Sequence, residues 1–241
     1  MRVQSLTLAA AGAALLSPVT LPAPTVPVAA HGPEPVHQRA AAREGGVRAG
    51  DLLAAVRGCA PVSEGRYRSD EGTVADIPVC GGKGAVFWKA DMDIDCDGRP
   101  GPYCNARTDS LFSSMTAFQQ SDGRYLSAET LPYIVVPAPG PVWDHRAHGI
   151  QGGSLAAVVY GDRVQYAVVG DVGPGEIIGE ASYATARGLG IRTDPHGGGT
   201  DSGVTYIVFE NSGVSPIEDH RAAAVRGEAL ARKFVRENRA S

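Results

Sequence analysis

Residues 155–171, LAAVVYGDRVQYAVVGD, constrain the fold more than any other stretch of the chain. Two runs rich in Val, Ala and Tyr flank Gly161 and Asp162, and a Gly-Asp pair between two such runs is typical of a tight β-hairpin turn. The second run ends at Asp171. The segment therefore predicts two antiparallel strands, the second of which ends in a carboxylate.

Other apolar runs predict further strands at 84–95 (GAVFWKADMDID), 131–137 (LPYIVVP) and 204–211 (VTYIVFEN). A short helix is expected at 49–58 and a terminal helix at 215–238, with Ser215 as N-cap, Pro216 in the first position and Glu218 completing a capping box. The 31 Gly and 17 Pro supply many turn signals. This pattern predicts a mainly β barrel with peripheral helices, including a C-terminal helix.

Four aspartates, Asp91, Asp93, Asp95 and Asp97, occupy every second position of one predicted strand. Successive side chains of a strand point to opposite faces, so this spacing predicts that all four carboxylates share one face. Like charges at such separations repel unless water or a cation compensates them. The row therefore indicates either a solvated strand edge or a face that binds a cation, which is a metal, a Lys or Arg, or a substrate.

The row partly matches a calcium-binding loop, because Asp93, Asp95, Asp97 and Gly98 fill the first, third, fifth and sixth positions of that pattern. Cys104 stands at the twelfth position, where the pattern has a bidentate Glu. An acidic strand edge that discourages aggregation is the second interpretation. An acidic groove for a cationic ligand is the third and the favoured one.

The charge distribution favours a cationic partner. Residues 91–180 hold twelve acidic residues and five arginines, a local charge of −7, whereas residues 219–241 carry a local charge of +3. Nucleic acid is therefore a poor candidate ligand. No stretch resembles a membrane-spanning helix, so no membrane partner is expected.

The first thirty residues follow a secretory pattern, with Arg2, the apolar run LTLAAAGAALL and small residues before His31. We expect a signal peptide at 1–30, a flexible leader at 31–50 and a catalytic domain at 51–241. The exported part holds four cysteines, which predicts two disulfide bonds and leaves three connectivities open. The pairing with the shortest loops is preferred, namely Cys59 with Cys80 and Cys96 with Cys104.

A second acidic constellation lies in residues 168–186, VVGDVGPGEIIGEASYATA. It contains Asp171 at a strand end, Glu176 in a turn and Glu180 at the start of a probable helix. Two carboxylates that flank a glycosidic bond can divide acid and base roles, provided that the Gly-Pro-Gly turn between them folds the chain back. An unrelated acidic turn explains the same residues equally well. The Gly-rich segment 194–203, DPHGGGTDSG, predicts a surface loop.

Together, the segments CGGKGAVFWKADMDIDCDG, VVYGDRVQYAVVGD and IGEASYATA resemble the secreted chitosanases of glycoside hydrolase family 75. This resemblance implies a six-stranded barrel of the double-psi type, endo-hydrolysis of β-1,4 links in the polycation chitosan, and inversion at the anomeric carbon. It implies Asp171 and Glu180 as the catalytic pair.

We therefore expect a secreted, monomeric endo-chitosanase that needs no cofactor or metal, with Glu180 as general acid and Asp171 as general base. Asp91, Asp93 and Asp95 are expected to bind the ammonium groups of glucosamine. Two alternatives remain open, namely a non-catalytic carbohydrate- or calcium-binding secreted module and a hydrolase of peptidoglycan.

Overall fold

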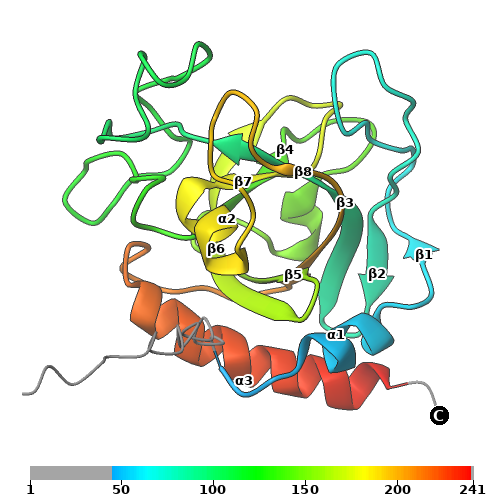
Figure 1. Cartoon of the computed structure of the whole chain (residues 1–241). Coiled ribbons are helices and arrows are strands. Elements are labelled where there is room, and N and C mark those ends of the chain that lie inside the picture. The colour runs from blue at the N-terminus through cyan, green and yellow to red at the C-terminus, as the bar shows by residue number, and fades with distance from the viewer. Residues whose placement is uncertain (1–44, 240–241) are drawn as a thin grey trace, which may run out of the picture. The chain divides into compact units, whose positions relative to one another are not determined.

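Eight strands form one sheet, and six of them close into a barrel (Figure 1). The computed structural model describes residues 45–239, all of which belong to one unit, Ala41–Ser241. The barrel strands follow the order β3-β7-β4-β6-β5-β8, and a further pairing of β8 with β3 closes the ring. The strands are β1 (Ala60–Pro61), β2 (Cys80–Gly82), β3 (Ala85–Asp95), β4 (Tyr133–Pro137), β5 (Leu155–Tyr160), β6 (Arg163–Gly173), β7 (Glu180–Ser182) and β8 (Thr200–Phe209).

The barrel contains both parallel and antiparallel strand pairs. β3 pairs with β7 and β4 pairs with β6 in parallel, whereas the β5–β6 hairpin and both partners of β8 are antiparallel. The hairpin turns at Gly161, whose φ of 58° suits glycine. The mainly β, six-stranded closed barrel and the predicted hairpin are therefore confirmed.

Both faces of the barrel strands are buried. In β3, Phe87 packs in one apolar cluster and its neighbour Trp88 in another. The first cluster also contains helix residues, among them Leu52 and Phe234. Burial on both faces explains why runs such as 204–209 are continuously apolar instead of alternating.

Three α-helices lie within the described residues: α1 (Ala49–Ala55), α2 (Tyr183–Leu189) and α3 (His220–Asn238), and a 3₁₀ helix covers His145–His148. Figure 1 shows α1 beside the long α3. The C-terminal helix is confirmed, but its predicted start is wrong. The carboxylate of Asp219 accepts a hydrogen bond from Ala222 N and caps α3, while the carboxylate of Glu218 accepts one from Ser121 N instead of turning back onto the helix.

Strand β3 runs from the helices to the loops that bear the acidic residues. Beside its first residue, Lys83 N donates to the side chain of Asn238 near the end of α3. β3 ends ten residues after Ala85, at Asp95, which is about 33 Å away along an extended strand. The helices therefore pack at one end of β3 and the acidic residues occupy the other.

The predicted disulfide pairing is confirmed, with Cys59 bonded to Cys80 and Cys96 to Cys104. The expected signal peptide and most of the expected leader lie outside the described residues. Within the last six residues of that leader, Gly46 N donates to Glu228 of α3. Across residues 45–239, none of the helices is both long enough and apolar enough to span a bilayer.

Candidate active site

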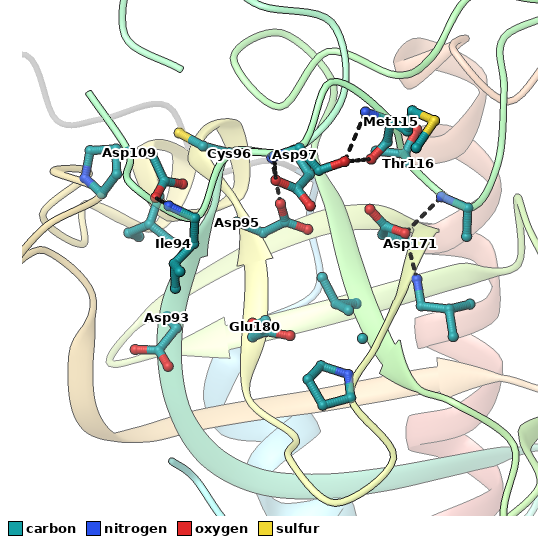
Figure 2. Close-up of a pocket in the computed structure, with 18 of the residues that line it drawn as sticks. Asp93, Ile94, Asp95, Cys96, Asp97, Asp109, Met115, Thr116, Asp171 and Glu180 are labelled. Atoms are coloured by element: carbon teal, nitrogen blue, oxygen red, sulfur yellow. Dashed lines mark hydrogen bonds between the residues drawn. The ribbon is translucent and has the colours of Figure 1, made fainter. Parts of the chain in front are cut away.

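An acidic cavity of about 800 Å³ lies at the loop-bearing end of β3 (Figure 2). Residues of β3, β4, β6 and β7 line it together with residues of the loops, and none of the described residues in this lining is Lys or Arg. Its carboxylates belong to Asp93, Asp95, Asp97, Asp109, Asp171 and Glu180. The fold thus brings both sequence constellations, which are far apart along the chain, to one cavity.

Asp171 is held rigidly by the backbone. It lies in β6 and is 7% exposed, and its Oδ1 accepts hydrogen bonds from Ala117 N and from Val172 N, both at 2.7 Å (Figure 2). Burial raises the pKa of Asp171 above its usual value, and the two N–H donors act against this rise because they stabilise the carboxylate. Asp171 is therefore the more readily ionised member of the predicted pair.

Glu180 lies on the short strand β7, where it pairs with Asp93 of β3. The expectation that it begins a helix is wrong, because β7 runs on to Ser182, whose side chain caps α2 by accepting from Thr185 N. A Cβ placed on Gly173 would lie 2.7 Å from Glu180 Oε2, so the Gly-Pro-Gly turn leaves room for this carboxylate. Burial, with the charges of Asp93 and Asp171 as further causes, raises the pKa of Glu180 to about 7.

Asp95 and Asp97 gather beside Asp171, since one carboxylate oxygen from each of the three lies within 4.8 Å of the others. Asp97 N donates to Asp95 Oδ1 at 2.6 Å, and Ser113 N donates to Asp97 Oδ1 at 2.7 Å. Burial raises the pKa of Asp97 to about 6 and that of Asp95 well above its usual value, and the charge of Asp171 adds to both rises. A cationic ligand would relieve this accumulation of charge.

The expected single face of four carboxylates is wrong in one respect. The pairing of β3 with β8 shifts register between Ala90 and Met92, where β8 holds two more residues than β3 does. Asp91 is 5% exposed and is not among the residues that line the cavity, whereas Asp93 lines it. The row therefore splits into Asp95 and Asp97 beside Asp171, and Asp91 and Asp93 beside Asp70.

These two carboxylate groups are the ones in residues 45–239 that lie close enough together to hold a metal ion. Neither reproduces the calcium-binding loop considered from the sequence. Asp93 and Asp95 lie in β3 instead of in a loop, and they belong to different groups.

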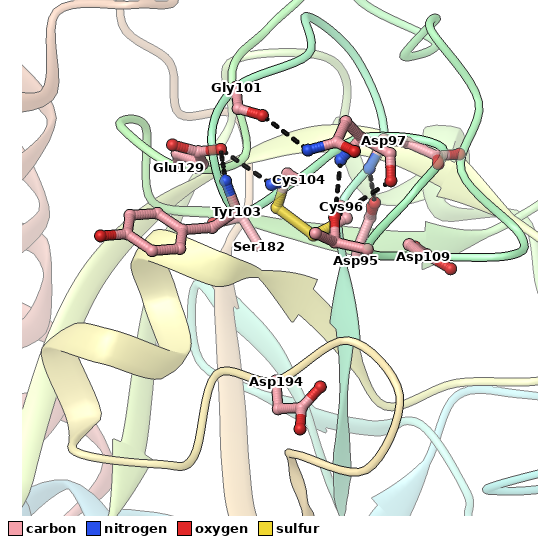
Figure 3. The surroundings of a disulfide bond; sticks show 12 residues. Asp95, Cys96, Asp97, Gly101, Tyr103, Cys104, Asp109, Glu129, Ser182 and Asp194 are labelled. Atoms are coloured by element: carbon pink, nitrogen blue, oxygen red, sulfur yellow. Dashed lines mark hydrogen bonds between the residues drawn. A yellow bond between two sulfur atoms is a disulfide. The ribbon is translucent and has the colours of Figure 1, made fainter.

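The loop after β3 is tied back by the second disulfide. Cys96 bonds to Cys104, and Glu129 Oε1 accepts hydrogen bonds from Tyr103 N and Cys104 N at 2.7 and 2.8 Å (Figure 3). This anchor lies directly before the segment 109–117, which lines the cavity and supplies Ala117 N to Asp171.

Sequence reasoning missed the two loops of the lining. Residues Ser113, Met115 and Thr116 come from one loop, and Pro195–Gly198 come from the segment expected to be a plain surface loop. Neither carries a motif, and only the tertiary fold brings them to the carboxylates.

Several characterised proteins are similar to this chain. Endo-chitosanase C of Aspergillus oryzae is 33% identical over 132 residues, which cover 53% of this chain and 32% of that protein. Endo-chitosanase B of Aspergillus oryzae (strain ATCC 42149 / RIB 40) is 29% identical over 150 residues, covering 56% and 62%. An endo-chitosanase of Aspergillus fumigatus is 32% identical over 122 residues, covering 46% and 49%. The chain spans less than two thirds of the length of each relative.

The match to a family covers a larger share of this chain than the match to any of these relatives does. Residues 92–237 match the family described as fungal chitosanase of glycosyl hydrolase group 75. This range contains Asp93, Asp95, Asp97, Asp171 and Glu180, and it covers more than half of the 241 residues. The chain therefore belongs to glycosyl hydrolase group 75.

Proposed function

We propose that this chain is an endo-acting chitosanase that hydrolyses β-1,4 links of chitosan with inversion, using Glu180 as general acid and Asp171 as general base. The observation that carries the proposal is the convergence of these two carboxylates, from β7 and β6, on one acidic cavity without Lys or Arg in its described lining. The family membership and the names of the relatives support the same substrate.

The environments of the two carboxylates support the division of roles. With a pKa of about 7, Glu180 keeps its proton in mildly acidic solution and can donate it to the glycosidic oxygen as the bond to the anomeric carbon breaks. Asp171, whose ionised form is favoured by Ala117 N and Val172 N, accepts a proton from the attacking water. The water oxygen bonds to the anomeric carbon from the opposite face, which inverts its configuration.

The remaining carboxylates of the cavity suit a polycationic substrate. Asp93, Asp95, Asp97 and Asp109 face the same space as the pair, and ammonium groups of glucosamine would compensate their charges. Asp91, which the sequence suggested as a further contact, is 5% exposed and is not among the residues that line the cavity, so we leave it out of the proposed binding surface.

We also propose that the enzyme acts outside the cell as a monomer. The two disulfide bonds support an oxidising compartment, and the apolar run at the start of the sequence is typical of a signal peptide.

The test is to supply chitosan, cellulose and peptidoglycan separately and to follow reducing ends, viscosity and the anomeric proton signals of early products. We expect release from chitosan alone, an early fall in viscosity, and the α-anomer as first product. If no reducing ends are released from chitosan, the proposal that chitosan is the substrate is refuted. The β-anomer as first product would refute the single displacement.

A further inference from the structure

A second group of carboxylates lies beside the proposed catalytic pair, and of its members Asp93 alone also lines the cavity. Asp70, in the turn 69–73, faces Asp91 and Asp93 of β3, and one carboxylate oxygen from each of the three lies within 4.8 Å of the others. The charge of Asp201 in β8 also acts on Asp93. The family match begins at residue 92, so Asp70 and Asp91 precede it.

No positive side chain compensates this group within residues 45–239. No ion pair joins Asp70, Asp91 or Asp93 to a Lys, Arg or His there. Arg68, the basic residue closest in sequence to Asp70, donates from its guanidinium to the carbonyl of Thr73 instead.

Asp91 shows what the group lacks. Its Oδ1 is the one carboxylate oxygen among residues 45–239 that is fully buried and has no hydrogen-bond partner. The side chain is 5% exposed, and the loss of hydration, with Asp93 as the next cause, raises its pKa to about 7. A buried polar oxygen without a partner is costly, so this arrangement fits a ligand that supplies positive charge.

We propose that Asp70, Asp91 and Asp93 bind one Ca²⁺ ion. Ca²⁺ takes oxygen ligands at about 2.3–2.6 Å, so two oxygens on opposite sides of the ion lie about 4.6–5.2 Å apart. Three carboxylate oxygens that all lie within this separation can therefore ligate one ion together. Mg²⁺ demands near-ideal octahedral geometry and dehydrates reluctantly, so a flexible set of carboxylates and waters suits Ca²⁺ better.

The exposure of the three side chains distinguishes a metal ion from a substrate ammonium group. Asp70 and Asp93 are exposed and leave room for water to complete the coordination, but Asp91 is almost completely covered. Because Asp91 is covered and does not line the cavity, its carboxylate suits a small ion better than a sugar ring of a polymer.

The position of the ion gives it a structural role. Next to Asp70, Arg68 N donates to the carbonyl of Glu176, and Ile178 N donates to the carbonyl of Arg68. These bonds attach the turn to the segment that leads into Glu180. Bound Ca²⁺ therefore fastens the turn 69–73 to β3 and supports that segment.

The test uses the full chain after treatment with EDTA. Ca²⁺ is titrated by isothermal calorimetry, and melting temperature is measured with and without the ion. We expect one Ca²⁺ per chain, a higher melting temperature with Ca²⁺, and weaker binding of Mg²⁺. Asp70→Asn should weaken Ca²⁺ binding at least tenfold. The matched control, Glu71→Gln, changes the exposed neighbouring carboxylate and should bind Ca²⁺ as the unaltered chain does.

Two outcomes would overturn the proposal. One is the absence of Ca²⁺ binding. The other is binding that Asp70→Asn leaves intact but that Asp97→Asn removes, because the ion would then occupy the group beside Asp171. Neither readout requires hydrolysis of chitosan, so failure here is distinct from failure of the proposed enzyme activity.

Discussion

Two acidic groups share strand β3 and differ in what holds their oxygens. Beside Asp171, backbone N–H groups donate to Asp95, Asp97 and Asp171 at 2.6–2.7 Å. Beside Asp70, the Oδ1 atom of Asp91 has no hydrogen-bond partner among residues 45–239. Backbone donors fix the oxygens of the first group, whereas a buried oxygen of the second lacks such a donor, which suits the ion that we propose. A row with uniform spacing is therefore divided between two different environments.

The largest expected effect is loss of the proposed acid or base. Asp171→Asn and Glu180→Gln should each lower kcat on chitosan by about 10²–10⁴-fold, because each removes one proton transfer from the transition state. Circular dichroism should show an unchanged fold, since neither substitution alters side-chain volume much.

The matched control is Glu176→Gln, which changes an exposed carboxylate in the same turn between β6 and β7. It should retain full activity. A Glu180→Gln variant as active as this control would remove Glu180 from the mechanism.

Asp97→Asn should have the next largest effect, since it weakens the backbone support of the cavity. Asp97 Oδ1 accepts from Ser113 N, in the loop whose Ala117 N donates to Asp171. A hydrogen bond to a charged group contributes about 1.5–3 kcal/mol, so kcat/KM should fall about 10–100-fold. Asp70→Asn, assayed with saturating Ca²⁺, is the comparison and should change kcat/KM much less. Equal losses in the two variants would erase the distinction between the groups.

Glu180→Gln should also stabilise the fold, most clearly above pH 7. The folded-state pKa of about 7 lies above the ordinary glutamate pKa of 4.5, so the folded chain binds more protons between these pH values and loses stability as pH rises through them. The Gln side chain does not titrate, so the variant does not lose stability in this way. Melting temperatures in EDTA should therefore favour Glu180→Gln at pH 8 and agree with the unaltered chain at pH 4. A variant less stable at pH 8 would show that Glu180 is not strained by its burial.

The smallest effect concerns salt. Attraction of a polycation by the acidic cavity is screened over about 10 Å at 0.1 M salt, so the KM for chitosan should rise several-fold between low and moderate salt while kcat changes little. A KM that does not change with salt would contradict electrostatic attraction by the cavity.

The sequence predicted the barrel strands other than β7, because these strands are apolar runs whose character does not depend on their neighbours. The hairpin at Gly161 and the local disulfide of Cys96 and Cys104 are likewise short-range features. The start of α3 was mispredicted because two overlapping capping signals, at Ser215 and Asp219, compete, and a contact of Glu218 with Ser121 decides between them.

The site was predictable only in part. Asp171 and Glu180 were predicted because the family motifs contain them, and both line the one cavity. The division of the aspartate row was not predictable, since it depends on the approach of Asp70 from a distant turn and of Asp171 from β6. Partners that arrive through tertiary structure leave no periodic signal in the sequence.

Chemical rescue tests the central claim most directly, that Glu180 gives a proton and Asp171 takes one. The substrate is a glucosamine oligomer with a good leaving group, which needs little protonation. We predict that Glu180→Gln recovers activity on it without additives, whereas Asp171→Asn recovers only when azide replaces the activated water and then yields an inverted glycosyl azide. Recovery of Asp171→Asn by the leaving group alone would exchange the two roles and contradict this account.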